Sequence, residues 1–420
     1  MFKCKLCEKD KLNEILDFGS QPVCNRFLQS RDLLEQCHQF AVEQCLNCGL
    51  IQLRNPAPVN EVRPQHPWIT YTEPEEHLDD LTDTILKITN IDPDSNVVGL
   101  SFKDDTLLER LRRKGIKNTR RLDVNKDLGL TSNYPGVESI QGCFNSENVP
   151  FLKKTFGQPK IIIARHILEH AHLALDFMKS LKQWVRSDGF IVIEAPDCTD
   201  ALDSLNYGTL WEEHIFYYTP KTFTNAFSFA GLKLAHFENY PYPLENLLIG
   251  IAQPSSPSLP NSIVELNKND SENLSEELLR GNRFSKEFSR IKNLYHNQLS
   301  RVKNSGCRMA VFGAGHLTCT FVNLLGLKSY FEFVVDDNPN KKDLFMPGSK
   351  LPIVDSKNLL IHKINLCVST LGKESEIKVF KKNQHYLDQG GIFLSIFSDF
   401  QKIQSVLSSV KPRPQSHLTT

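Results

Sequence analysis

The spacing of apolar residues divides the middle of the chain into alternating strand-like and helix-like segments. Short runs rich in branched residues predict buried strands at 97–100, 119–123, 161–164 and 189–194. Apolar residues at helical spacing predict helices at 77–88, 106–114 and 173–185. Strands that alternate with helices predict a parallel sheet covered by helices on both faces.

The same alternation returns after a change of composition at residues 253–285, which predicts a domain boundary whose later part is helical. The second series comprises strands at 308–312, 333–336 and 366–370, with a helix at 318–325. The fold class expected from both series is α/β, with two Rossmann-like domains. The last residues, 411–420, contain Pro and Ser and are expected to be disordered.

The first fifty residues lack long periodic runs and contain two Cys-x-x-Cys pairs. Cys4, Cys7, Cys45 and Cys48 match a structural zinc site, because each pair can present two sulfurs to one ion. A disulfide framework or a thioredoxin-type redox pair is the alternative, but the segment is turn-rich and has no signal-peptide pattern. Cys24 and Cys37 could in principle replace a ligand, although neither stands at paired spacing. A shell of four sulfurs leaves no open position, so the zinc is expected to hold structure only.

The amino-acid composition and net charge give no indication of a nucleic-acid or membrane partner. The 420 residues are 40% hydrophobic and 23% charged with a formal net charge of +0, which gives no electrostatic reason to expect nucleic acid or an anionic membrane. No apolar run approaches the ~20 residues that a membrane span needs. The chain opens Met-Phe-Lys-Cys without an apolar signal core, so a cytoplasmic, reducing location is expected.

Two strand ends carry features of nucleotide sites. Gly313 and Gly315 lie at a strand-to-helix turn, where glycines let backbone amides approach a phosphate, and Asp336 ends the next strand, where a ribose is typically held. A glycine turn required only for helix packing remains the alternative, since Thr318 stands near the place of the third glycine. In the middle domain, Asp123 ends the second strand in the same way, with a solvated aspartate as its alternative.

Two histidine-rich segments are candidates for acid–base chemistry. One is residues 165–172, directly after the third strand of the middle domain, and the other is 211–218, where His214 follows two carboxylates among aromatic residues. Active sites of open α/β sheets gather at the carboxyl ends of strands. Each histidine taken singly is also compatible with a buried structural residue, but their joint occurrence favours a site.

Several motifs together resemble the sugar C-methyltransferases, which use S-adenosylmethionine (SAM) to methylate a carbon of a nucleotide-linked deoxy-ketosugar. The segments that carry the resemblance are Cys4–Cys7, Gln21–Leu28, Cys45–Leu53, Ala164–His170, Glu194–Pro196, Glu213–Tyr217, Gly313–Gly315, Val335–Lys341 and Pro347–Ile353. The resemblance implies a zinc-binding module at 1–60, a SAM-dependent methyltransferase-like domain at 61–252, a linker and helix at 253–300, a C-terminal Rossmann-like domain at 301–410 and a tail at 411–420.

The resemblance also implies roles for single residues. His214 would be the base that forms the enolate, Glu213 its orienting carboxylate and His170 a neighbour of the sugar oxygen, with Tyr71 lining the site. The implied SAM-binding residues are Leu100, Asp104, Asp105, Leu107, Asp123, Ala164, Arg165 and His166. The implied substrate-binding residues are Trp68, Glu194, Trp211, Gly313, Gly315, His316 and Asp336.

The chain departs from the family pattern in its cofactor loop. Ser101 and Asp105 stand where the family has glycines, and Trp211 stands where the family usually has a tyrosine. The main hypothesis is a SAM-dependent C-methyltransferase acting on a nucleoside-diphosphate sugar, as a monomer or weak homodimer. A relative that binds a sugar nucleotide without SAM-dependent catalysis, and a zinc-stabilised interaction scaffold, are the alternatives.

Overall fold

The computed structural model describes residues 3–69, 73–129, 136–243, 245–255, 268–398 and 400–411. These residues form two compact units, which are described separately. The first unit comprises Met1–Asp17, Phe40–Leu202 and Glu212–Arg283, and the second comprises Phe18–Gln39, Asp203–Trp211 and Phe284–Thr420. The N-terminal sixty residues are therefore divided between the two units.

A four-stranded sheet contains the N-terminal strands. Its order is β1 (Leu12–Pro22), β2 (Cys37–Cys45), β3 (Ile51–Leu53) and β8 (Phe216–Tyr217). The last pair is antiparallel and joins Ile51 to Tyr217, residues that lie far apart in the sequence. The strand that follows the Glu213–His214 segment therefore completes the sheet of the cysteine-rich module.

The central sheet of the first unit has six strands in the order β5-β4-β6-β7-β10-β9. Their bounds are β4 Val97–Gly99, β5 Thr119–Arg121, β6 Ile161–Arg165, β7 Phe190–Asp197, β9 Leu232–Tyr240 and β10 Asn246–Pro254. The four predicted strands are present and parallel. The prediction omitted the β9–β10 hairpin, which adds two strands and pairs antiparallel to β7.

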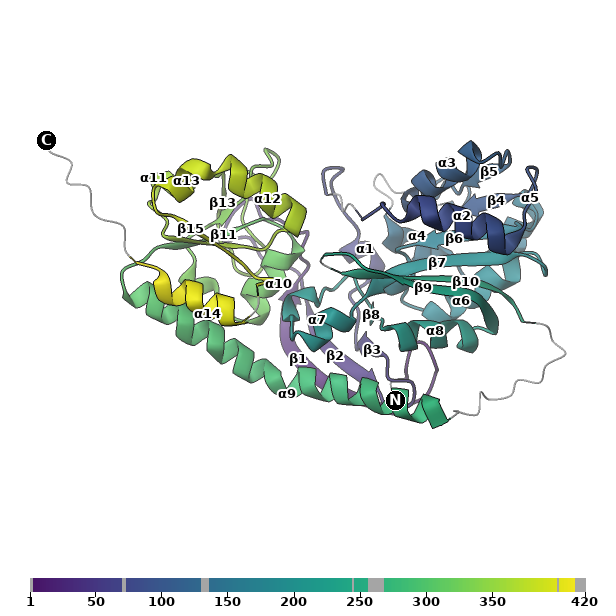
Figure 1. Ribbon diagram of the computed structural model, residues 1–420, viewed down its shortest axis with the longest axis horizontal. Helices are drawn as coiled ribbons and strands as arrows, with labels where there is room; N and C mark the ends of the chain where they lie inside the picture. Colours follow the sequence, from purple (N-terminus) through teal and green to yellow (C-terminus); the bar gives the residue numbers. More distant parts are fainter. Residues whose placement is uncertain are drawn as a thin grey trace, which may run out of the picture. The chain divides into compact units, whose positions relative to one another are not determined.

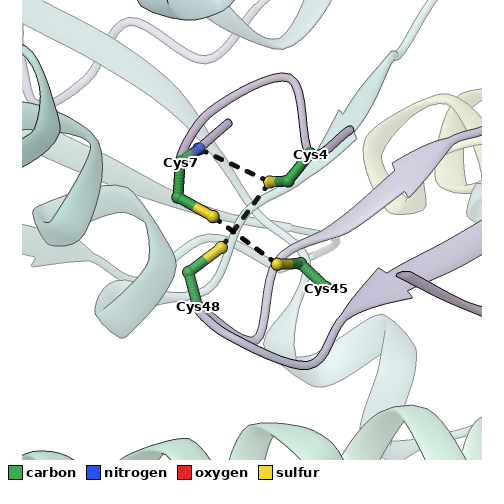
Figure 2. A group of neighbouring side chains, drawn as sticks. All are labelled: Cys4, Cys7, Cys45 and Cys48. Atoms are coloured by element: carbon green, nitrogen blue, oxygen red, sulfur yellow. Dashed lines mark hydrogen bonds between the residues drawn. The ribbon is translucent and has the colours of Figure 1, made fainter. Parts of the chain in front are cut away.

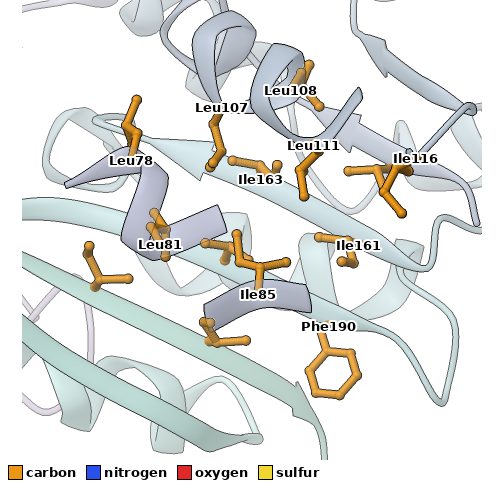
Figure 3. Packing of buried hydrophobic residues seen from close by; sticks show 14 residues of the cluster. Leu78, Leu81, Ile85, Leu107, Leu108, Leu111, Ile116, Ile161, Ile163 and Phe190 are labelled. Carbon is orange, nitrogen blue, oxygen red and sulfur yellow. The ribbon is translucent and has the colours of Figure 1, made fainter. Parts of the chain in front are cut away.

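Helices cover both faces of this sheet, with α2 (Leu78–Thr89) and α3 (Asp105–Arg113) on one face and α6 (Ala174–Trp184) and α8 (Pro220–Phe229) on the other (Figure 1). All four helices present an apolar stripe to the strands. On the α2–α3 face, leucines and isoleucines of both helices pack against alternate residues of β4, β6, β7 and β10 (Figure 3). Helix α2 ends where Asn90 adopts a left-handed conformation and its N–H bonds the Leu86 carbonyl.

Shorter helical elements lie between β3 and β8 in the sequence. Three of them are 3-10 turns at or near the functional residues, and the others are short helices. Their bounds are α1 Val59–Val62, η1 Phe102–Asp104, α4 Val137–Cys143, α5 Val149–Phe156, η2 Leu168–His170, α7 Thr199–Asp203 and η3 Tyr207–Thr209, the last of which belongs to the second unit.

The second unit is built on a five-stranded parallel sheet in the order β13-β12-β11-β14-β15. The strands are β11 Met309–Phe312, β12 Val334–Val335, β13 Ile353–Val354, β14 Leu366–Ser369 and β15 Ile392–Ser395. The helical elements are α10 His316–Leu324, η4 Lys328–Tyr330, α11 Asn358–Ile361, α12 Lys373–Lys382, α13 Gln384–Asp388 and α14 Phe400–Ser409. This confirms the second Rossmann-like sheet.

Three segments before residue 301 also belong to this second unit, namely 18–39, 203–211 and 284–300. Leu28 forms a β-bridge with Phe345, and the Gly348 N–H donates to Glu35 Oε1 over 2.7 Å. The 37-residue helix α9 (Lys268–Asn304) begins within the residues of the first unit and ends within those of the second (Figure 1). Among the helices that the structure describes, none has the length and apolar character required to cross a membrane.

We expect Leu111→Ala to lower the free energy of unfolding of the first unit by about 2–5 kcal/mol, because a fully buried leucine of α3 would leave a cavity against the sheet. Denaturant unfolding measures this loss. Leu173→Ala is the control, since that side chain is 68% exposed, and it should change the stability by less than about 0.5 kcal/mol. Equal losses for both variants would contradict the packing described here.

Candidate functional site

The four predicted cysteines meet at one point in the first unit (Figure 2). Cys4 Sγ lies 3.7 Å from Cys48 Sγ, and Cys7 Sγ lies 3.6 Å from Cys45 Sγ. Zn–S bonds of about 2.3 Å at tetrahedral angles place sulfurs about 3.8 Å apart, so the cluster has the size of a zinc site. The backbone N–H groups of Cys7 and Asn47 point at Cys4 Sγ and Cys45 Sγ, which stabilises thiolates. Neither Cys24 nor Cys37 belongs to the cluster. These four residues therefore hold a structural zinc ion.

The zinc module is joined to the histidine segment by backbone hydrogen bonds. Strand β3 begins three residues after Cys48 and pairs with β8, and the Leu53 N–H donates to the Ile215 carbonyl over 2.8 Å. On the opposite side, the Ile215 N–H donates to the Glu169 carbonyl over 2.7 Å. The peptide that follows His214 is thus held between the zinc module and the turn after β6.

His170 and His214 are brought together as predicted, at the edge of the sheet where β6 ends. Their rings meet edge to face with centroids 4.8 Å apart. Possible ligand atoms of Glu169, His170 and His214 all lie within 4.8 Å of one another. Burial lowers the pKa of His170 to about 3, so its imidazole is neutral at any working pH. Two imidazoles and a carboxylate can serve acid–base chemistry and are also a donor set that a divalent cation accepts.

His166, unlike His170, is positively charged. Burial by itself would lower the pKa of this imidazole, but the carboxylates of Glu73, Glu169 and Glu194 outweigh burial and raise it to about 10. Its Nε2 lies 2.7 Å from Glu194 Oε1, and its Nδ1 lies 3.4 Å from Glu169 Oε1. The backbone of His166 is left-handed, with φ of 52°, which is unfavourable for a residue with a side chain. The site therefore contains a buried imidazolium beside the neutral His170.

Glu194, at the end of β7, organises the cations of this edge. Its carboxylate is fully buried and contacts Arg165 Nε and His77 Nε2 at 2.9 Å each, in addition to His166. The charges of Arg165 and His166, together with the hydrogen bonds from His166 and His77, outweigh the effect of burial and hold the pKa of Glu194 well below its usual range. The other nitrogen of His77 lies 2.7 Å from the Tyr242 hydroxyl. Because both oxygens of Glu194 already have protein partners, its implied contact with substrate remains a prediction, and the structure gives it a positioning role.

The loop after β4 uses its backbone donors internally. The Ser101 N–H donates to Asp104 Oδ2 over 2.8 Å, and the Lys103 N–H donates to Ser101 Oγ over 3.1 Å. Asp104 Oδ1 accepts from the Arg165 N–H, and burial raises the pKa of Asp104 to about 7 although these hydrogen bonds oppose the shift. The loop is therefore closed by its own side chains and does not offer the bare amides of a glycine loop.

The chemistry of the remaining groups fits SAM. Asp123 follows β5, is half-exposed and can reach the hydroxyls of a ribose, although one of its oxygens accepts the N–H groups of Asn125 and Lys126. At the end of β4, Lys103 and Glu73 supply charges of both signs, which an amino acid requires. SAM would contribute an electrophilic methyl group on a sulfonium centre.

For the other described residues of the first unit that the resemblance assigns to ligand binding, the structure shows side chains that are buried or engaged elsewhere. The side chains of Leu100, Leu107 and Ala164 lie in the core, which leaves only their backbones for a ligand. Asp105 pairs with Arg121 over 2.6 Å. Trp68 stacks on His66 at a centroid distance of 5.0 Å, and Tyr71 lies outside the described residues.

In the second unit, the predicted glycine turn lies between β11 and α10. Asp336 accepts the Ala314 N–H over 2.9 Å and contacts Lys341 Nζ at 3.0 Å, so its carboxylate shapes the turn itself. A Cβ on Gly313, whose φ is 105°, would lie 2.6 Å from Leu371. Gly315 caps α10, and Trp211 stacks on His316 with centroids 4.2 Å apart. Trp211 and His316 thus lie side by side, and their implied contact with substrate remains a prediction.

Three residues of the first unit were not predicted to take part in the site: His77, Glu73 and Lys103. His77 was assigned to the start of a helix, and only its long-range contact with Glu194 shows its other role. Lys103 had one available signal, since it is the only cation in the loop that follows the first strand of the sheet.

We expect Cys48→Ser to reduce bound zinc from one ion per chain to a small fraction, and to unfold the N-terminal sheet, because structural zinc sites contribute folding energy outright. Metal analysis and far-UV circular dichroism measure both effects. Cys37→Ser, an exposed cysteine outside the cluster, should retain one zinc per chain. Full zinc content in Cys48→Ser would refute the ligand set.

The stability that His166 contributes should depend on pH. Its pKa is about 10 in the fold and ~6.5 when unfolded, so the contribution is fully present below about pH 6.5 and disappears as the pH rises through about 10. The gap in melting temperature between wild type and His166→Gln should therefore narrow over this range. A constant gap would mean that His166 is not charged in the fold.

The chain is similar to several known proteins. A relative, the C-methyltransferase NovU of Streptomyces niveus, is 20% identical over 404 residues, which cover 93% of this chain and 94% of that protein. Among solved structures, the magnesium protoporphyrin IX methyltransferase of Synechocystis is similar at 15% identity and a TM-score of 0.30 over 43% of this chain and 82% of its own. The 1,6-didemethyltoxoflavin-N1-methyltransferase of Burkholderia thailandensis is similar at 10% identity and a TM-score of 0.30, over 43% of this chain and 80% of its own.

Family models match three successive parts of the chain. They are described as a zinc binding domain at residues 4–62, a methyltransferase domain at 70–236 and a C-methyltransferase C-terminal domain at 251–397. The third match begins at residue 251 and so includes the segment 253–300, which the sequence motifs assigned to a linker and helix. The chain is a methyltransferase whose successive parts match a zinc binding domain, a methyltransferase domain and a C-methyltransferase C-terminal domain.

Proposed function

We propose that this protein transfers a methyl group from SAM to the carbon beside the ketone of a nucleoside-diphosphate-linked deoxysugar. The observation that carries the proposal is the meeting of His214, His170 and Glu169 at the carboxyl end of β6, next to the cations that Glu194 holds. The acidic C–H of a ketosugar requires a base, and the enolate oxygen requires a positive or hydrogen-bonding partner.

In this proposal His214 takes the proton from the sugar carbon, and Glu213, which is buried beside it, orients the imidazole. The electron pair of the broken C–H bond forms the enolate, whose carbon then bonds to the methyl group. The neutral His170, whose N–H is held by the Glu213 carbonyl, packs against His214, and the His166 imidazolium stabilises the negative charge of the developing oxyanion. A neutral and a positively charged histidine thus have different roles in this proposal.

We further infer that the chain acts in a reducing, cytoplasmic setting, because zinc thiolates and the described cysteines, none of which forms a disulfide, suit it. The glycine turn of the second unit is proposed to contact the nucleoside diphosphate through Gly315 and the Trp211–His316 stack. The alternative is a relative that binds a sugar nucleotide without SAM-dependent catalysis. One observation favours it: the backbone donors of the loop after β4 are already engaged within the loop.

We expect His214→Asn to lower turnover of a nucleoside-diphosphate-linked keto-deoxysugar by about 10²–10⁴-fold, because a general base contributes that much. Its affinity for S-adenosylhomocysteine should stay within about twofold of wild type, since asparagine keeps the polar shape. Product formation by mass spectrometry and calorimetry measure the two quantities.

His236→Asn is the control, because His236 lies on β9 with Glu238 as its neighbour and should leave turnover unchanged. Retained turnover in His214→Asn would refute its role as base. If no ketosugar in a panel of uridine and thymidine diphosphate derivatives is methylated or shifts the melting temperature, the substrate class is wrong.

A further inference from the structure

An ion pair occupies the carboxyl end of β4, where the loop of this chain departs from a glycine loop. Lys103 Nζ lies 2.7 Å from Glu73 Oε1, and the lysine side chain is only 11% exposed. Glu73 comes from the segment before α2, so the pair joins two parts of the first unit that are distant in sequence. The long side chain of Lys103 thus turns inward at a sheet edge that SAM-binding folds use for their cofactor.

The backbone around this pair is firmly held. Arg165 donates through Nη1 to the Lys103 carbonyl, and Thr106 Oγ1 donates to Glu75 Oε1 over 2.6 Å. The Ser101–Asp104 capping box closes the loop from within. The ends of Lys103 and Glu73 are therefore presented from a fixed frame, which is what a binding site requires.

The carboxylate of the pair is ionised at working pH. Burial would raise the pKa of Glu73, but His166 and Lys103 lower it to about 2. Glu73 therefore stays ionised even when Lys103 turns to another anion, because His166 remains beside it at 4.0 Å. A fixed cation beside a fixed anion is complementary to a zwitterion, whose own carboxylate and ammonium can meet the two charges crosswise.

We propose that Lys103 and Glu73 bind the amino-acid end of SAM, Lys103 its carboxylate and Glu73 its ammonium, in place of the amides of a glycine loop. The proposal rests on the proposed SAM-dependent function and adds the recognition of one half of the cofactor. It explains how a loop whose amides are engaged internally still serves a methyltransferase. A plain structural ion pair is the competing explanation, and it predicts no difference between ligands with and without the amino acid.

The test is calorimetric binding of three probes, none of which requires turnover: S-adenosylhomocysteine, its decarboxylated analogue, and 5′-methylthioadenosine, which lacks the amino-acid group. Lys103→Met should weaken S-adenosylhomocysteine about tenfold or more, because a hydrogen bond to a charged group is lost, and should change methylthioadenosine binding less than about threefold. Lys103→Arg keeps the charge and should restore most of the affinity. Glu73→Gln should weaken S-adenosylhomocysteine in the same selective way.

Lys114→Met is the control, because Lys114 also pairs with a carboxylate, Asp83, but on the exposed outer side of α3. It should bind all three probes as wild type does. If Lys103→Met does not fold, binding to the wild-type protein still tests the proposal. Wild type should bind the decarboxylated analogue about tenfold more weakly than S-adenosylhomocysteine.

Equal affinity of Lys103→Met and wild type for S-adenosylhomocysteine, or equal affinity of wild type for the two thioethers with and without the carboxylate, would overturn the proposal and leave the proposed function intact. Failure of wild type to bind S-adenosylhomocysteine at all would instead overturn the proposed function, and this inference with it.

Discussion

The antiparallel pairing of β3 with β8 is the constraint on which the rest of the first unit depends. One end of this short ladder is fixed by Cys45 and Cys48, and the other end leads directly back to His214. Two residues of strand pairing would be marginal in isolation. The zinc ion makes the ladder rigid, because its ligands precede β3 within one turn. A metal that takes no part in chemistry thus determines where the histidine stands.

The charged residues at the sheet edge form a second level of organisation. Glu194 lies at their centre and gathers Arg165, His166 and His77. Burying one carboxylate is unfavourable, but the Arg165 guanidinium and the His166 imidazolium outweigh this cost, and His166 places a positive charge at the site. The neutral His170 can exist beside this cation because burial disfavours a second charge. Desolvation and ion pairing therefore give neighbouring histidines different properties within one turn of chain.

Local patterns predicted the parts of the protein that depend on local physics. The Cys-x-x-Cys pairs located the metal, and runs of branched residues located four strands within a few residues, because tetrahedral ligation and strand burial both leave a short-range signal. The proximity of His170 and His214 came from the family resemblance and was not visible in either segment. Glu73, His77 and Lys103 were missed, since an ion pair between distant segments has no periodicity. The β9–β10 hairpin was missed although β9 alternates buried and exposed residues, which was a usable signal.

The division of the N-terminal residues between two units has a consequence for how this architecture can be recombined. Residues 18–39 belong with the C-terminal sheet, whereas the zinc ligands belong with the first unit and their sheet is completed by β8. The N-terminal sixty residues therefore cannot be transferred to another protein without the parts of the chain that pair with them. Exchanging the N-terminal segment between relatives would require compatible partners at residues 216–217 and around Phe345. The N-terminal segment and these two partner regions are therefore expected to be inherited together.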